Sequence, residues 1–233
     1  NARHLTVENP HGYIGFADGW AARDMGRALA IDRYTEDWDN HTRIYSPDLR
    51  YPGEGSWTVE ALVWVPEGSS PYSLVWHYSE HWAGHEPYGL GLTPDSRFWF
   101  ATQPASDELW RMEGGVLTRG VWHHVAGVYD DAAGRNRLYV DGVLVNEREA
   151  GRPENLQAYN VYIAGSWFGV HGPMWVDEIR ISNKARRPDE LLGCAPQIAV
   201  PPQSVTAMVG TTARFAVTAT GTPPLAYQWL FNG

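Results

Sequence analysis

Short runs rich in β-branched and aromatic residues recur along most of the chain, and Gly, Pro, Asp and Asn separate them. Helical periodicity is nearly absent, and strands at such spacing without intervening helices predict an antiparallel β-sandwich or barrel. Several runs are apolar at nearly every position, as in central strands that are covered on both faces. The predicted strands are WTVEALVWV (57–65), YSLVWHY (72–78), YGLGL (88–92), RFWFATQ (97–103), WHHVAGVYD (122–130), RLYVDGVLV (137–145), VYIAGSW (161–167) and WVDEIRIS (175–182), and ARRPDELLG (185–193) predicts a terminal helical turn.

The composition changes after this turn. From Cys194 onward the chain contains no His, Asp, Glu or Lys, and new strand-like runs appear as SVTAMV, ARFAVTA and LAYQWLF. The change indicates a domain boundary. We therefore expect a first domain over residues 1–193, a linker over 194–197 and the beginning of a second domain over 198–233.

Charge and composition narrow the classes of partner. The formal net charge is −9 and no Lys/Arg-rich run occurs, which argues against nucleic acid and anionic membranes. Aromatic residues make up 13% of the chain and include 12 Trp, so some rings are expected to face a ligand such as a neutral glycan. The single cysteine excludes an internal disulfide and a cysteine-based zinc site. No apolar run approaches the roughly 18 residues of a membrane span, so no membrane insertion is expected.

Two family resemblances are visible in the sequence. Residues 55–193 resemble the laminin-G-like, or concanavalin A-like, jelly roll of secreted bacterial proteins through GSWTVEALVWV, YGLGL, GVWHHVAGVYD, RLYVDGVLV, YIAGS and VDEIRISNKARRPDEL. GRALAID (26–32) is similar to the family's opening strand. Residues 196–233 resemble the first half of a bacterial immunoglobulin-like domain, with Trp229 as the strand-C tryptophan and Phe215 in place of the strand-B cysteine. The resemblances imply an all-β fold, namely an antiparallel jelly-roll sandwich plus a partial immunoglobulin-like sandwich.

The polar residues of WHHVAGVYDDAAGRNRLYVDGVLV have structural explanations. Successive side chains of a strand point to opposite faces, so His123 and His124 are expected on different faces rather than on one metal. Asp130 and Asp131 precede a polar loop and favour a turn. Asp141-Gly142 predicts a two-residue hairpin turn.

Catalytic patterns are weak. Residues 77–81 match the H-x-x-E-H zinc-protease pattern, but that chemistry requires a helix, and on a strand His77 and His81 lie roughly 13 Å apart. Together with His85 they leave open an adventitious metal site in a loop. The paired-carboxylate run of related glycoside hydrolases is absent, and Glu147 and Glu149 are expected to be solvated. We therefore assign no catalytic residue.

A structural calcium ion is implied by the jelly-roll resemblance. Such domains often bind Ca²⁺ through an aspartate of the last strand and carbonyls of nearby loops, and Asp177 interrupts the apolar run MWVDEIRI. Gly55 is expected to supply a carbonyl oxygen, and Asp18 is a further candidate. The alternative is that Asp177 and Glu178 only pair with Arg180 or with main-chain amides.

Aromatic side chains between residues 72 and 88 provide the candidate ligand site. Flat rings stack on the apolar faces of sugars, and polar neighbours bind hydroxyl groups, although core packing is the usual role of a single Trp. A loop that carries such side chains on a rigid sandwich is a typical place for a binding site. The expected ligand-binding residues are Trp76, Tyr78, His81, Trp82, His85, Glu86 and Trp99.

We expect a non-catalytic module that recognises a polysaccharide or glycan by aromatic stacking, with calcium stabilising its fold. Because the sequence begins abruptly at Asn1 and stops abruptly at Gly233, we expect a piece of a larger multidomain protein, secreted or on a cell surface. Two alternatives stay open: a jelly-roll hydrolase or lyase with an unrecognised site, and an adhesion module that binds protein. Fold alone does not decide among them.

Overall fold

The computed structural model describes most of the chain in segments. These are residues 6–8, 14–18, 27–31, 43–46, 55–69, 73–77, 88–102, 110–150, 161–166, 169–170, 172–192, 197–220 and 227–230. No helix in these segments is long and apolar enough to span a membrane.

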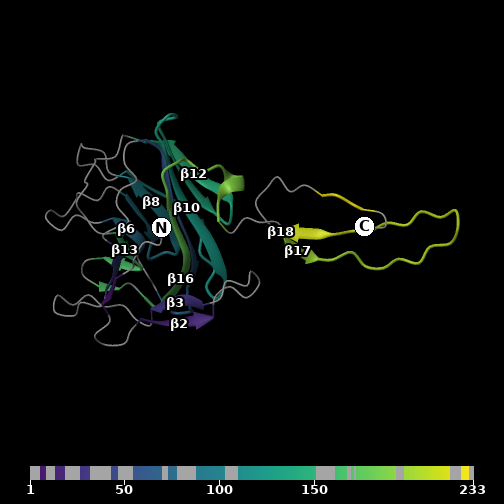
Figure 1. Ribbon diagram of the computed structural model, residues 1–233, viewed down its shortest axis with the longest axis horizontal. Helices are drawn as coiled ribbons and strands as arrows, with labels where there is room; N and C mark the ends of the chain where they lie inside the picture. Colours follow the sequence, from purple (N-terminus) through teal and green to yellow (C-terminus); the bar gives the residue numbers. More distant parts are fainter. Residues whose placement is uncertain are drawn as a thin grey trace.

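Two seven-stranded antiparallel sheets form the body of the molecule (Figure 1). Sheet A consists, in spatial order, of β1 (Thr6–Glu8), β4 (Arg43–Ser46), β13 (Val161–Ile163), β6 (Ser73–His77), β7 (Tyr88–Leu92), β8 (Arg97–Thr102) and β9 (Trp110–Val116). Sheet B consists, in spatial order, of β12 (Val143–Glu149), β11 (Arg135–Val140), β10 (Trp122–Asp130), β5 (Trp57–Trp64), β16 (Met174–Ser182), β3 (Arg27–Ile31) and β2 (Ile14–Asp18). The short strands β14 (Gly165–Ser166) and β15 (Gly169–Val170) pair with each other.

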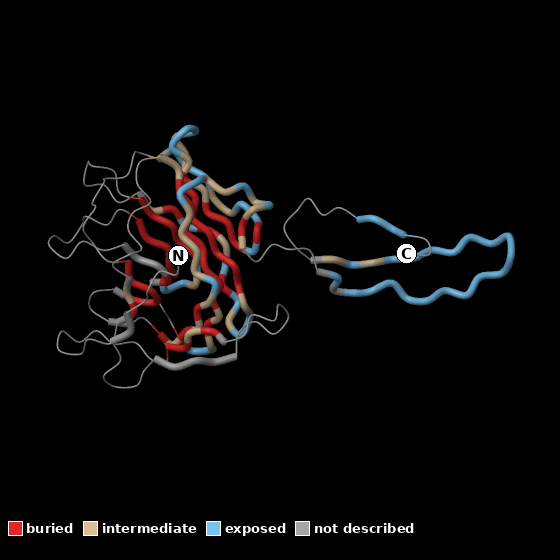
Figure 2. Tube along the Cα trace, viewed as in Figure 1, coloured by how far each residue is buried: buried red, intermediate tan, exposed pale blue. Residues whose placement is uncertain are grey.

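The hydrophobic core lies between the inner faces of the two sheets, where Figure 2 shows the buried strands. In β5, the central strand of sheet B, alternate residues from Trp57 to Val63 belong to this core. Residues Thr58, Glu60, Leu62 and Trp64 alternate onto the outer face of the sheet. The first three of these are also fully buried, so the outer face of sheet B is covered as well.

The predicted strands are confirmed with small changes at their ends. The run 137–145 is a hairpin of β11 and β12, and its turn residues Asp141 and Gly142 both have positive φ, at 51° and 77°. This is the backbone of the turn that Asp-Gly favours. The run 161–167 is interrupted at Ala164, whose φ is also positive. The predicted helical turn is present as a short 3₁₀ helix, η2 (Pro188–Glu190).

The C-terminal segment forms a separate two-stranded sheet of β17 (Gln197–Val200) and β18 (Thr218–Thr220) (Figure 1). The predicted partial immunoglobulin-like sandwich is not shown: within residues 197–220 and 227–230, only Gln197–Val200 and Thr218–Thr220 are strands. Phe215 and Trp229 contact each other with ring centroids 6.2 Å apart, yet both stay more than half exposed. A pair of short strands cannot bury such side chains, because a sheet of this size has no opposing layer.

Candidate functional site

Tyr162 of β13 is fully buried, between core residues Val161 and Ile163, and its neighbours in the sheet register are also aromatic. The main chain of Tyr162 in β13 pairs with Tyr45 of β4 on one side and with Trp76 of β6 on the other. We call these three positions the aromatic row. The rings of Tyr45 and Tyr162 lie 5.9 Å apart. Beyond Trp76 the same register continues to Gly89 of β7, which has no side chain to cover its neighbours.

The candidate loop starts where this row ends. His77, the last residue of β6, pairs with Tyr88, the first residue of β7, so the two strands hold both ends of residues 78–87. The predicted ligand-binding residues Tyr78, His81, Trp82, His85 and Glu86 belong to this connection and lie outside the described residues. The strand conformation up to His77 agrees with the interpretation that the H-x-x-E-H match does not begin on a helix.

Trp99 of β8 is buried. Only 3% of the residue is exposed, and its indole Nε1 donates to the carbonyl oxygen of Leu92 at 3.1 Å. The guanidinium of Arg111 lies over its ring at 5.1 Å from the centroid, and Arg111 also pairs with Glu113 at 2.9 Å. The side chain of Trp99 thus holds Arg111 in place on sheet A, and one of its ring faces is already occupied.

The two adjacent histidines lie on opposite faces of β10, as predicted. His123 packs edge-on against the core residue Phe98, and its Nδ1 lies 2.8 Å from Asp141 Oδ2. His124 Nε2 lies 3.0 Å from Glu60 Oε2 on the outer face of sheet B. Asp141 also accepts the main-chain N–H of His124, so its carboxylate ties the hairpin turn to β10. Both imidazoles therefore serve to hold neighbouring strands and turns in place.

Asp177 lacks a full set of partners within the described part of the chain. Its Oδ1 accepts the N–H of Glu178 at 2.8 Å, whereas Oδ2 is buried and makes no hydrogen bond there. Burial raises the pKa of this carboxyl group, the Glu178 N–H opposes the rise, and the negative charge of Glu178 adds to it. A cation beside Oδ2 would relieve the cost of the charged form.

The structure separates two of the calcium candidates, Gly55 and Asp177. Asp177 pairs with Leu62 of β5, whereas Gly55 precedes Leu62 by seven residues, about 23 Å along an extended strand. Asp18 ends β2, which is separated from β16 only by β3. No group of three or more His, Cys, Asp or Glu arranged for a metal occurs among the described residues. Gly55 is therefore not a neighbour of Asp177, and the side chain of Asp18 lies outside the described residues.

Sequence reasoning missed a row of three tryptophans on sheet B. Trp122 of β10 pairs with Trp64 of β5, which pairs with Trp175 of β16, and the last two rings stack at 4.2 Å. All three side chains are partly buried. Their positions follow from period-two alternation once the pairing of these strands is known.

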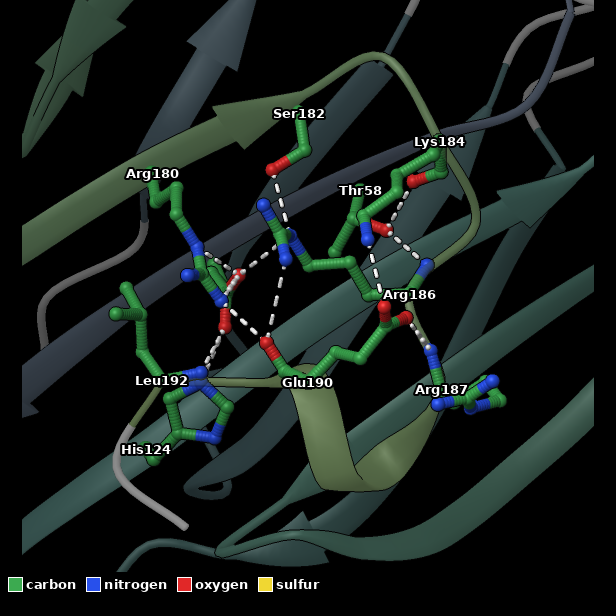
Figure 3. Close-up of polar contacts among 10 residues, drawn as sticks. Thr58, His124, Arg180, Ser182, Lys184, Arg186, Arg187, Glu190 and Leu192 are labelled. Carbon is green, nitrogen blue, oxygen red and sulfur yellow. Dashed lines mark hydrogen bonds and ion pairs between the residues drawn. The ribbon is translucent and has the colours of Figure 1, made fainter. Parts of the chain in front are cut away.

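A second missed feature is the carboxylate of Glu60 in the middle of sheet B. Glu60 is fully buried and accepts hydrogen bonds from Arg180 Nε at 2.6 Å, from the Leu192 N–H at 2.6 Å and from His124 at 3.0 Å. Figure 3 shows these labelled partners converging from β10, β16 and the segment that follows β16. Burial acts to raise the pKa of Glu60, but the bonds from His124, Leu192 and Arg180 outweigh it and hold the pKa below its usual value.

Comparison with known proteins agrees with this architecture. The family model of the concanavalin A-like lectin/glucanases superfamily matches residues 39–192, about two thirds of the chain. The chain belongs to this superfamily. The match spans both sheets of the sandwich and ends at Leu192, the residue whose N–H binds Glu60. No curated protein sequence matches the chain significantly.

Solved structures with the same concanavalin A-like fold include carbohydrate-binding domains. Domain 4 of AbnA, an extracellular arabinanase from Geobacillus stearothermophilus solved with arabinotriose, is 18% identical, with a TM-score of 0.55 over 80% of this chain and 84% of that chain. The CBM40 of the Ruminococcus gnavus IT-sialidase, bound to α2,3 sialyllactose, is 15% identical, with a TM-score of 0.51 over 60% of this chain and 82% of that one. The binding domain of Paraclostridial Mosquitocidal Protein 1 is 14% identical, with a TM-score of 0.56 over 81% of this chain but only 46% of the toxin domain.

Proposed function

We propose that this chain is a non-catalytic carbohydrate-binding module of an extracellular or cell-surface protein. The observation that carries the proposal is the concanavalin A-like fold, which solved carbohydrate-binding domains share, and the sequence adds the aromatic connection after β6 that contains Trp82. Aromatic rings on a rigid sheet bind the apolar faces of sugars at low entropic cost. The solved relatives with sialyllactose and arabinotriose support glycans as the ligand class.

The ligand surface in this proposal comprises Trp76 and the residues of the β6–β7 connection. Rings at positions 76, 78 and 82 stack on sugar, while His81, His85 and Glu86 bind hydroxyl groups. Trp99 acts through Arg111, which it holds on the same sheet by the contact described above. The net charge of −9 favours neutral or cationic glycans over highly sulfated ones.

The first prediction concerns Trp82. A glycan array and pull-down on insoluble polysaccharides should identify a ligand for the wild-type chain, and Trp82→Ala should weaken binding at least about tenfold because a stacking face is lost. Trp76→Ala should act in the same direction. Trp122→Ala, on the opposite sheet, is the matched control and should bind as the wild type does.

Other outcomes would replace the proposal. Release of reducing or unsaturated sugars that is abolished by His81→Ala or Glu86→Ala would make the chain a hydrolase or lyase. Blank glycan assays together with saturable binding to a protein would make it an adhesion module. The similarity to a toxin's binding domain favours binding over catalysis in either case.

We also propose a structural Ca²⁺ at Asp177, with Asp18 at the end of β2 as a further candidate ligand. The buried, unbonded Oδ2 supports this, because a positive partner there would offset the cost of burying the charged form. EDTA should then lower the melting temperature of the wild type, and excess Ca²⁺ should restore it. At a hundredfold excess over Kd, bound Ca²⁺ should add about 2.7 kcal/mol to the free energy of unfolding. Asp177→Asn should abolish the response. A wild-type melting temperature that is indifferent to EDTA would remove calcium from the proposal.

The immunoglobulin-like resemblance of residues 198–233 also stays a proposal. An immunoglobulin-like sandwich would require strands beyond β17 and β18 to cover Phe215 and Trp229. In that arrangement the module is one part of a larger multidomain protein.

A further inference from the structure

The segment after β16 returns across the outer face of sheet B. We call residues 183–192 the strap. Its residues Ala185 and Leu191 pack on Ala126, Val128 and Tyr139, which form a small apolar cluster outside the main core. An apolar contact of this size is weak beside the core between the sheets. Polar contacts must therefore supply much of what holds the strap.

Two side chains of β5 hold the main chain of the strap at its two ends. Thr58 Oγ1 donates to the carbonyl oxygen of Lys184 at 2.8 Å and accepts the N–H of Arg186 at 3.0 Å. Glu60 accepts the N–H of Leu192 at 2.6 Å. Both residues are fully buried, and both belong to the central strand of the sheet. Figure 3 shows Thr58 beside Lys184 and Arg186.

Arginines bridge the strap to the same carboxylate. Arg180 of β16 binds Glu60 Oε1 and also donates through Nη2 to the carbonyl oxygen of Glu190 at 2.7 Å. Arg186 of the strap lies 3.8 Å from Glu60 Oε1. Charge-assisted bonds of this kind are stronger than neutral ones, and a buried carboxylate that loses them is costly. Glu60 thus binds groups of both the sheet and the strap.

We propose that the strap is a separately opening unit that Glu60 holds closed. Its opening would increase the distance that the chain after residue 192 can span from the sandwich. When it is closed, Leu192 is fixed to the centre of sheet B. When it opens, ten residues are released while the two sheets keep their core, which gives up to about 33 Å of additional chain. The strap is then an extensible tether between the sandwich and the segment that begins with β17.

Tryptic cleavage and hydrogen exchange test this directly. The strap carries Lys184 and Arg186, whose main chains bind Thr58 when it is closed, so cleavage there under native conditions reports the open population. In Glu60→Gln we expect cleavage after these residues, and exchange of the Leu192 amide, to be at least about tenfold faster than in wild type. In wild type and variant alike, the amides of β10 and β11 should exchange more slowly than the Leu192 amide, because they open only with the core.

A second variant and a control allow the test even if Glu60→Gln does not fold. Thr58→Val removes the bonds to Lys184 and Arg186 without a change of charge, and it should also open the strap selectively. Glu147→Gln removes a carboxylate from sheet B that pairs with Arg137 away from the strap, and it should leave the strap closed. Strap exchange and cleavage that are no faster than exchange in β10 and β11, or that stay at wild-type rates in both variants, would overturn the proposal.

Discussion

At the scale of single residues, Gly127 shows how closely the two sheets approach. A Cβ atom at this position of β10 would lie 2.2 Å from Cδ2 and 2.4 Å from Cε2 of Phe100 in sheet A. Phe100 is fully buried in the core, so its ring has little freedom to move away. Overpacking a core typically costs 1–3 kcal/mol. Gly127→Ala should therefore lower the free energy of unfolding by about 3 kcal/mol, measured by urea denaturation.

A double mutant checks the cause of that loss. Phe100→Leu removes the ring that the new Cβ would strike, so Gly127→Ala should cost clearly less in that background than in the wild type. If the two losses simply add, the contact with Phe100 is not the reason that position 127 is glycine.

Individual polar residues were predicted well only where their reason is local. Asp141 and Gly142 could be assigned to a turn from their types alone, and strand alternation was enough to separate His123 from His124. Glu60 could not be assigned in this way. Its partners Arg180 and Leu192 are 120 and 132 residues away in the chain, and they become neighbours only when β16 pairs with β5.

At the scale of elements, the strap makes stability depend on pH through Glu60. The folded protein holds the pKa of this carboxyl below its ordinary value of 4.5, so the unfolded chain binds the proton more tightly. The stabilisation by Glu60 is complete at neutral pH, begins to fall near pH 4.5 and is lost as the pH drops through the depressed folded pKa. Acid therefore weakens the attachment of the strap.

Denaturant unfolding at several pH values measures this effect. At pH 7, Glu60→Gln should be less stable than wild type by about 3 kcal/mol, the lower end for breaking a buried pair, since Arg180 keeps partial access to water. The difference between the two proteins should shrink at pH values below 4.5. A difference that is constant with pH, or that grows toward acid, would contradict the assigned role of the charge.

Elements themselves were largely predictable. The runs 57–65, 88–92 and 122–130 became strands with nearly the predicted bounds, because their patterns and their turn residues agree. The strand run 161–167 was wrong in extent, since Ala164 takes a positive φ that nothing in its sequence signals. The short strands β1, β2 and β4 have weak patterns of their own and are defined by the partners they pair with.

At the scale of the whole molecule, the two sheets have different outer faces. Sheet A carries the aromatic row and leads into the β6–β7 connection, whereas the outer face of sheet B is occupied by the strap and the tryptophan row. The strap is therefore attached on the side of the core that faces away from sheet A. A glycan bound to sheet A need not compete with movement of the strap.

The sequence by itself determined the fold class, most strands, the hairpin at Asp141 and the change of composition after residue 193, because these depend on periodicity and turn chemistry within short stretches. Only the tertiary structure decided that Trp99 is buried under Arg111, that Gly55 lies far from Asp177, and that Trp122, Trp64 and Trp175 share one register. It also decided that Glu60 is the centre of a buried network. The physical reason is that strand pairing brings together residues far apart in the chain, and the sequence of each strand does not specify its neighbour.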